Sequence, residues 1–333
     1  MRKLNFLSHL LLCLALGMLP AAVGAQTLLV VNQGDANLSL IDPAAGRQVA
    51  TIAEKTTEVH GHEIAASADG HTAFMPIYGS SGVGKPGIDG HDMLVIDLRS
   101  RKIVDDIDFG HGVRPHFPVL DPASGLLYVT TELDKTVTAF DPRTRKIVGT
   151  IPTGQEESHM LALSHDGHRG YTANVGPGTV SVLDMVGRKT VAIIPVAKTV
   201  QRISVSADDK LVFTSDQTKP QLAVIDTATN KVKTWVPLPG LGYGTAATSD
   251  GRWLLVAVPA ANQVAVVDLG SMKVARRIDV ANSPQEILVR PDGKVAYVSC
   301  AASGKVAAID LTQWSVQKLI DAGKFADGLA WAP

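Results

Sequence analysis

Short runs of alternating apolar and polar residues fill most of the chain beyond residue 25. The run Thr179–Asp184 (TVSVLD) is an example, and Gly, Asp and Pro residues separate such runs from one another. A two-residue period interrupted by turn-forming residues is typical of short antiparallel β-strands. Because no later segment has the 3.6-residue period of a long helix, the pattern predicts an all-β protein.

In each group of four runs, one run ends with an aspartate. These aspartates recur at a nearly constant interval along the chain, except that the first interval, between Asp42 and Asp97, is longer. An interval of roughly 42 residues with four short strands is typical of a β-propeller blade. We interpret this marker as a scaffold residue that accepts backbone hydrogen bonds in a turn, because catalysis does not require seven copies of one group. The markers are Asp42, Asp97, Asp141, Asp184, Asp226, Asp268 and Asp310.

The repeats predict a seven-bladed β-propeller with four antiparallel strands in each blade. The innermost strand is the apolar run before an Asp-Gly-type turn, as in residues 158–167, and its seventh copy begins near Asp327. The second strand also has seven copies, the first at residues 28–31. The C-terminal innermost strand is therefore expected to join the N-terminal strands, which closes the ring without a free edge. We expect residues 26–333 to form this single domain.

Three segments of the repeat carry a resemblance to a known family. Residues 170–174 (GYTAN), Thr179–Asp184 (TVSVLD) and residues 296–299 (AYVS) resemble the YVTN-repeat β-propellers of the YncE-like group. The resemblance covers essentially the whole chain after residue 25 and implies a secreted or periplasmic seven-bladed propeller. Members are described as binding proteins or surface-layer components, one is associated with DNA binding, and related propellers include lactonases and lyases. The resemblance therefore implies no single activity.

The N-terminal segment, residues 1–25, has the organisation of a secretory signal peptide. A basic start precedes an apolar run at residues 10–19 and small residues up to Ala25. The apolar run is too short to span a bilayer comfortably, and Leu12 before Cys13 disfavours a lipoprotein signal. We predict cleavage after Ala25 and a periplasmic or secreted mature protein without a transmembrane segment.

Charge and composition argue against some partners. The full chain has 31 Lys and Arg against 32 Asp and Glu, and cleavage removes only Arg2 and Lys3 from these sets, so the mature protein is slightly acidic. Aromatic residues make up 5% of the full chain. A nucleic-acid partner is not expected, because it requires a basic surface or stacking residues. Cys300 is the one cysteine left after cleavage, which excludes an internal disulfide. We expect a monomer.

The most distinctive departure from the repeat lies in blade 2. The interval from Asp69 to Asp97 is ten positions longer than the equivalent interval from Asp208 to Asp226, and the additional positions lie within residues 77–92. This Gly-rich loop contains Lys85 and should lie on the face where the innermost strands begin. We interpret it as a lid in which Lys85 closes over an anion, and neutral variation of a surface loop is the alternative.

Polar residues begin the innermost strands and are expected to surround the mouth of the central channel. Small apolar residues follow them, as in a funnel above a packed wall. Counting back from Gly125 would place Phe117 at the mouth in place of His116. The predicted ligand-binding residues are His62, Arg114, His116, His159, Gln201, Arg202, Tyr243, Gln285 and Asp327, together with Lys85.

The histidines suggest a divalent metal as a cofactor. His62, His116 and His159 come from consecutive blades, and three neutral imidazoles can hold Zn²⁺, Cu²⁺ or Fe²⁺ with an open position. The sequence lacks the local spacing of a metal motif. A polar ligand funnel without a metal is therefore the preferred interpretation, and the metal site is the alternative.

Charged residues near the mouth allow two interpretations each. Arg114 and Arg202 can clamp a carboxylate or phosphate, or they can pair with acidic residues inside the channel, such as Glu63. Glu286 and Glu157 beside imidazoles can form a general-base pair, or they can orient a histidine.

Three functions remain open at this point. The first is binding of a small polar or anionic ligand, or a peptide, at the channel mouth. The second is a lactonase-type hydrolase or a lyase, for which the catalytic candidates are His62, His116, His159 and Glu286. The third is nucleic-acid binding, which rests on the resemblance alone.

Overall fold

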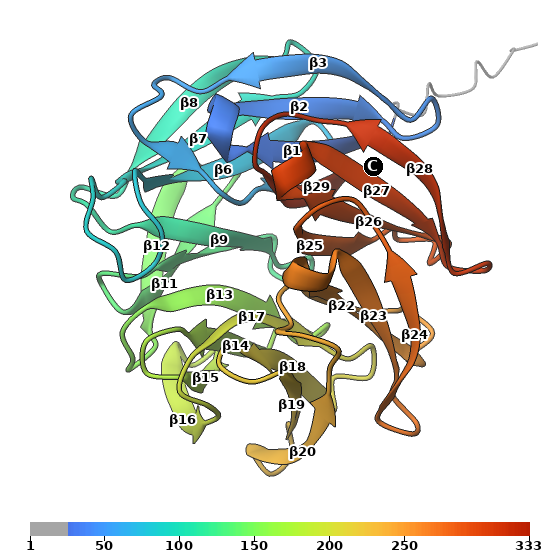
Figure 1. Ribbon diagram of the computed structural model, residues 1–333. Helices are drawn as coiled ribbons and strands as arrows, with labels where there is room; N and C mark the ends of the chain where they lie inside the picture. Colours follow the sequence, from blue (N-terminus) through green and yellow to red (C-terminus); the bar gives the residue numbers. More distant parts are fainter. Residues whose placement is uncertain (1–25) are drawn as a thin grey trace, which may run out of the picture.

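The computed structural model describes residues 26–333, and the predicted signal peptide lies outside the described residues. The described chain forms seven blades of four antiparallel strands around a central axis (Figure 1). The predicted all-β, seven-bladed propeller is confirmed. The helical elements within residues 26–333 are short 3-10 turns, and none of them is long and apolar enough to cross a membrane. They are η1 (Gln33–Asp35), η2 (Pro259–Ala261) and η3 (Ala301–Ser303).

The first four blades contain the N-terminal half of the chain and the C-terminal strand, and strands are given from the axis outward. Blade 1 comprises β29 (Ala326–Ala332), β1 (Thr27–Asn32), β2 (Asn37–Asp42) and β3 (Arg47–Ala53). Blade 2 comprises β4 (His60–Gly61) and β5 (Ala65–Ala66), then β6 (Thr72–Gly79), β7 (Asp92–Asp97) and β8 (Lys102–Asp108). Blade 3 comprises β9 (Pro115–Leu120), β10 (Leu127–Thr131), β11 (Thr136–Asp141) and β12 (Lys146–Pro152). Blade 4 comprises β13 (Ser158–Leu163), β14 (Arg169–Asn174), β15 (Thr179–Asp184) and β16 (Lys189–Pro195).

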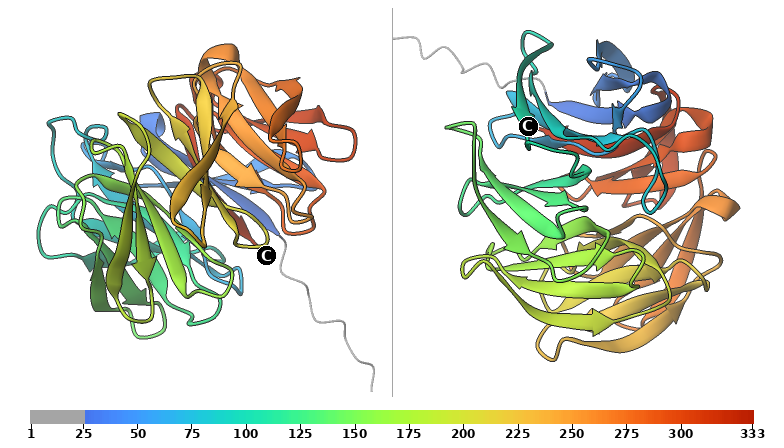
Figure 2. Two further views of the ribbon diagram at one scale, coloured as in Figure 1. Left: turned by 90° about the horizontal axis from the view of Figure 1, so that it is seen from below. Right: turned by 90° about the vertical axis from the view of Figure 1, so that its left-hand side faces the viewer.

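The remaining three blades follow the same order, and Figure 2 shows them as twisted sheets around the axis. Blade 5 comprises β17 (Val200–Val205), β18 (Leu211–Asp216), β19 (Gln221–Asp226) and β20 (Lys231–Pro237). Blade 6 comprises β21 (Thr245–Ala247), β22 (Trp253–Val258), β23 (Gln263–Asp268) and β24 (Lys273–Asp279). Blade 7 comprises β25 (Pro284–Val289), β26 (Val295–Cys300), β27 (Lys305–Asp310) and β28 (Ser315–Asp321).

The two ends of the described chain close the ring, as the repeat count predicts. β29 pairs antiparallel with β1, and Leu28 lies opposite Trp331. Figure 1 shows the red β29 beside the blue β1. This pairing leaves no blade incomplete, so the inner strands bring residues from distant parts of the sequence to one axis.

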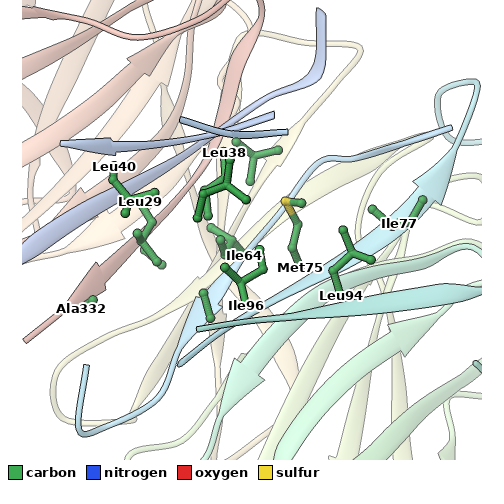
Figure 3. Close-up of a cluster of buried hydrophobic side chains, with 13 residues drawn as sticks. Leu29, Leu38, Leu40, Ile64, Met75, Ile77, Leu94, Ile96 and Ala332 are labelled. Atoms are coloured by element: carbon green, nitrogen blue, oxygen red, sulfur yellow. The ribbon is translucent and has the colours of Figure 1, made fainter. Parts of the chain in front are cut away.

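Apolar side chains between neighbouring blades hold the ring together. Leu29 of blade 1 and Ile64 and Met75 of blade 2 belong to one buried cluster (Figure 3). Burying each side chain of this size contributes about 1.5–3 kcal/mol. Because such clusters cover both faces of a blade, its middle strands are buried along most of their length, as in β2.

The marker aspartates end the third strand of every blade and stabilise the turn that follows. In blade 1, for example, Asp42 Oδ1 accepts hydrogen bonds from the backbone N–H groups of Ala44 and Ala45, each at 2.9 Å. The other six accept equivalent backbone bonds. The interpretation of these residues as scaffold is confirmed.

The innermost strands of blades 2 and 6 are shorter than the repeat predicts. Blade 2 has two fragments, β4 and β5, and His62 lies between them because its carbonyl accepts a hydrogen bond from Gly328 N of blade 1 at 2.9 Å. In blade 6, Tyr243 precedes β21. The next residue, Gly244, lies so close to blade 7 that a Cβ would be 2.1 Å from the carbonyl oxygen of Gln285.

Candidate functional site

β-bulges in the innermost strands place the predicted mouth residues. In β17 the register shifts between Val200 and Ile203, so that Gln201 and Arg202 together oppose one residue of β18. Such bulges redirect side chains and are frequent beside functional sites. At the bulge in β9, His116 lines the cavity, whereas Phe117 packs against two buried clusters, so the structure resolves the one-residue ambiguity in favour of His116. Equivalent shifts lie at His116, His159, Gln285 with Glu286, and Asp327.

A cavity of about 300 Å³ lies at this mouth. Eight of the ten predicted ligand-binding residues line it, and Arg114 and Lys85 do not. The sequence analysis missed several lining residues because they lie in loops rather than on the innermost strands. The predicted lining residues are His62, His116, His159, Gln201, Arg202, Tyr243, Gln285 and Asp327, and the missed ones include Gln33, Ser283 and Phe325.

Arg202 is the centre of an acidic cluster on one side of the cavity. The side chain is buried, and Nη1 lies 2.5 Å from Glu63 Oε1 while Nη2 donates a 2.9 Å hydrogen bond to Asp327 Oδ1. Glu286 Oε2 lies 4.0 Å from Nη1. The guanidinium also lies 5.0 Å from the centre of the Tyr243 ring. One positive charge therefore faces three largely buried carboxyl groups.

Burial controls the protonation of this cluster. It raises the pKa of Glu63 well above the usual value despite the opposing effect of Arg202, and it raises the pKa of Glu286 as well. Burial opposes the charge on Arg202, but Glu63 and Asp327 outweigh that effect and raise its pKa well above the usual value. The cluster thus keeps a charged arginine and holds protons on its acidic side more tightly than exposed carboxyl groups do.

Three predicted histidines form a second, aromatic group beside the cavity. The rings of His116 and His159 stack with centroids 3.7 Å apart, and His62 lies edge-on to His116 at 5.5 Å. His116 Nδ1 is 3.1 Å from the carbonyl oxygen of His159, which makes Nδ1 the donor and leaves Nε2 as the acceptor. Burial, and then the neighbouring positive groups, lowers the pKa of His62 and of His116 well below the usual value. Both imidazoles are therefore neutral.

Glu132 joins this group and was missed by the sequence analysis. One carboxylate oxygen contacts His159 Nδ1, and the other accepts a 2.8 Å hydrogen bond from the Tyr78 hydroxyl. This contact holds His159 in the tautomer whose Nε2 is an acceptor, as in the pairing of a general base with its orienting group. Glu132 follows β10 and Tyr78 lies on β6, so the ends of second strands reach the same mouth. Polar residues at those ends are the signal that could have identified them.

The predicted metal ligands do not point at one position. Two imidazoles that share a metal direct their nitrogens toward it, whereas the rings of His116 and His159 lie within 24° of parallel. Within residues 26–333, the one set of three such side chains whose ligand atoms lie within 4.8 Å of one another is His91, Asp92 and Asp108, outside this cavity. A metal held by His62, His116 and His159 stays a prediction that requires these rings to rearrange.

The inserted loop of blade 2 reaches the cavity. Gly82 and Val83 line it, whereas the side chain of Lys85 is exposed. Arg114 holds the loop, because Nε donates to Asp89 Oδ1 at 2.5 Å and Nη2 donates to the carbonyl oxygen of Lys85 at 2.8 Å. The structure therefore places Arg114 as an anchor between blade 3 and the loop rather than in the cavity wall.

Residues with left-handed backbone precede four of the innermost strands. In non-glycine residues this conformation costs roughly 1–2 kcal/mol each. Such residues often have side chains that are required at their position. They are Arg114 (φ 50°), Glu157 (φ 48°), Ser283 (φ 58°) and Phe325 (φ 51°).

Comparisons with known structures support the fold. Hydrazine synthase from Kuenenia stuttgartiensis superposes with a TM-score of 0.73 and 18% identity, over 86% of this chain and 93% of that one. A protein of unknown function from Desulfotomaculum acetoxidans gives 0.75 and 12%, over 92% and 98%. The dihydro-heme d1 dehydrogenase NirN, solved in complex with DHE, gives 0.63 and 13%, over 91% and 74%. Identities this low show the fold alone.

Sequence comparison identifies the family. No curated protein matches the chain. The narrower resemblance to the YncE-like group stays a prediction. The family model for the cytochrome D1 heme domain matches residues 122–330, which is more than half of the chain, and the protein therefore belongs to the cytochrome D1 heme domain family.

Proposed function

We propose that this protein binds a small, positively charged molecule at the mouth of its central channel. The observation that carries the proposal is the excess of carboxyl groups around Arg202. Asp327 lines the cavity, and its two oxygens each accept one hydrogen bond, from Arg202 at 2.9 Å and from Gln33 at 2.5 Å. A carboxylate can accept about four hydrogen bonds, so Asp327 has capacity left for a protonated amine.

An anionic ligand, which the sequence suggested as an alternative, has less support. The guanidinium of Arg202 is already engaged by Glu63 and Asp327, and an added anion would approach these two carboxyl groups and Glu286. Because this guanidinium is already paired, it has little charge left to attract an anion. The remaining lining groups, such as Gln201, Tyr243 and Gln285, offer neutral hydrogen-bonding partners. They suit the polar part of a small cation.

The family implies a heme of the d1 type, and the residues present do not fit one. The cavity of about 300 Å³ lies at the lower end of the range for small-molecule sites, whereas a tetrapyrrole is larger than most small ligands. An axial histidine must present a nitrogen to the iron. His62, His116 and His159 are only 8%, 1% and 3% exposed, and His62 Nε2 is fully covered. We assign no step to a heme.

A thermal-shift screen with matched ligands tests the proposal. Small amines and guanidines are compared with carboxylates of the same carbon skeleton at pH 7. A ligand at 100 times its Kd stabilises the folded state by about 2.7 kcal/mol, which raises the Tm by several degrees. We expect amines to do so, and Asp327→Asn to remove the shift while the surface control Asp292→Asn keeps it. Stabilisation by carboxylates but not by amines would refute the proposal.

The contact between Glu132 and His159 supports a second candidate, a hydrolase or lyase of the lactonase type. His159 lines the cavity, and Glu132 orients its ring through Nδ1, as the carboxylate partner of a general base does. Hydrolysis of a panel of uncharged lactones is the assay. Activity that His159→Gln and Glu132→Gln both reduce by about 10²–10⁴-fold would establish catalysis, and hydrolysis at the buffer rate would dismiss it.

We propose that the mature protein acts in the periplasm or outside the cell, as a monomer and without a nucleic-acid partner. The basis is the predicted signal peptide and the near-neutral charge. N-terminal sequencing of protein recovered from the periplasm is expected to begin at Gln26. Light scattering is expected to give the monomer mass. Retention of residues 1–25 would contradict the predicted cleavage, and a larger mass would contradict the predicted monomer.

A further inference from the structure

We infer that the ligand carries a flat ring and that Phe325 is the residue that selects it. This inference rests on the proposed function, because it concerns the same cavity and names the rest of the molecule whose cationic end meets Asp327. Phe325 lies in the loop between β28 and β29, two residues before Asp327. The same short segment thus supplies an aromatic side chain and a carboxylate to one cavity.

The exposure of Phe325 is unusual for its place in the fold. The side chain is 61% exposed although it lines the cavity, and its backbone has a φ of 51°. A bulky residue rarely adopts this conformation, and Gly or Asn would adopt it at lower cost. The turn before the innermost strand accounts for the backbone conformation but not for the choice of a large aromatic side chain. An exposed ring held in a strained turn suggests a contact with a partner molecule.

The other residues in this backbone position already have contacts for their side chains. Arg114 binds the inserted loop through Asp89, and Ser283 Oγ accepts a 2.9 Å hydrogen bond from Gln285. Glu157 lies beside the same loop, where a Cβ on Gly84 would be 2.9 Å from its Oε1. Phe325 differs, because no aromatic stacking partner for its ring lies within residues 26–333.

Phe325 and other apolar residues line the same cavity, and together they form its apolar wall. Gly34 of η1 supports it, since a Cβ there would lie 3.0 Å from Phe325 Cδ2. Val83 of the inserted loop and Ala301 and Ala302 of η3 line the same cavity. Aromatic rings prefer stacked or edge-to-face contacts with such a side chain. The wall and Asp327 together fit an aromatic amine, and the cavity of about 300 Å³ limits it to about one ring with a short arm.

Two probes of matched shape test this inference. 2-Phenylethylamine and 2-cyclohexylethylamine carry the same arm and amine and differ in the aromaticity of the ring. Their Kd values are measured by calorimetry for the wild type, Phe325→Leu and Asp327→Asn, with Val186→Ala as the control. Val186 is 73% exposed and lies outside the cavity. We expect Phe325→Leu to reduce the preference for the phenyl compound by about two- to tenfold, and Val186→Ala to leave it unchanged.

The outcomes separate this inference from the proposed function. Asp327→Asn is expected to weaken both amines to a similar degree, because it removes the partner of their common end. If both amines bind and Phe325→Leu leaves their ratio unchanged, the role of Phe325 is refuted and the cationic site stands. If neither amine binds the wild type, both are refuted. Loss of the phenyl preference without loss of Tm would exclude a merely structural effect of the substitution.

Discussion

Replacing Arg202 with Met should destabilise the folded protein, because it removes the positive charge that pairs with the carboxyl groups at the channel mouth. Arg202 is 3% exposed and faces Glu63 at 2.5 Å and Asp327 at 2.9 Å. Removing one partner of a buried ion pair costs about 3–5 kcal/mol, because the remaining charges stay buried without compensation. At about 2 °C per kcal/mol for a domain of this size, the Tm should fall by about 6–10 °C.

The loss of stability caused by Arg202→Met should also depend on pH. Burial already raises the pKa of Glu63 and Glu286, and removal of the guanidinium raises both further above their values in the unfolded chain. A carboxyl group with a raised folded pKa contributes stability that is complete below its unfolded pKa and disappears as the pH rises through the folded one. The difference between Arg202→Met and the wild type should therefore be smaller at pH 4 than at pH 8.

Denaturant unfolding at both pH values is the assay, with two controls. Glu63→Gln in the Arg202→Met background should restore part of the stability at pH 8, because it removes one of the unpaired acids. Arg290→Met breaks a pair with Asp292 on the surface and should cost less than about 1 kcal/mol. An equal loss at pH 4 and pH 8, with no recovery in the double variant, would show that Arg202 acts through packing rather than charge.

Three further substitutions or additions test other parts of the account. Arg114→Ala should release the inserted loop, because two charge-assisted bonds worth about 1.5–3 kcal/mol each are lost. Amide hydrogen exchange in residues 80–91 should then become at least about 100 times faster, and unchanged exchange would contradict the anchoring role. Burial raises the pKa of Glu54 to about 8, so its destabilising effect should appear as the pH rises from about 4.5 to 8. Glu54→Gln should stabilise the protein by up to about 5 kcal/mol at pH 9 but not at pH 4. Equal effects in urea unfolding at both pH values would contradict this. Hemin titration should give no imidazole-ligated absorption spectrum, and a spectrum that His62→Ala or His116→Ala abolishes would show that the cavity opens to admit a heme.

The fold could be predicted well from the sequence because every blade repeats the same strand pattern and the same turn. A constant interval between marker aspartates reflects one turn geometry, so Asp42 to Asp310 could be placed without any tertiary information. The closing pair of β29 and β1 follows from counting strands. The broken innermost strand at His62 could not be foreseen, because it depends on a bond to the neighbouring blade.

The repeat shows which residues begin the innermost strands and so lie near the channel mouth. It does not show which side chains contact one another there. The bulge in β17 presents Arg202 beside Gln201, and no local pattern encodes how far each side chain enters the cavity. Arg114 was assigned to the ligand, whereas its partner Asp89 comes from another blade. Glu132 and Phe325 were missed because they lie beyond the strand ends on which the count was based.

A crystal structure of the protein soaked with 2-phenylethylamine tests the central claim most directly. We expect electron density in the cavity at the channel mouth, with the amine within hydrogen-bonding distance of Asp327 and the ring against Phe325. Density for the amine at another surface, with only solvent in this cavity, would contradict the claim that the acidic cluster forms a binding site for a small cation.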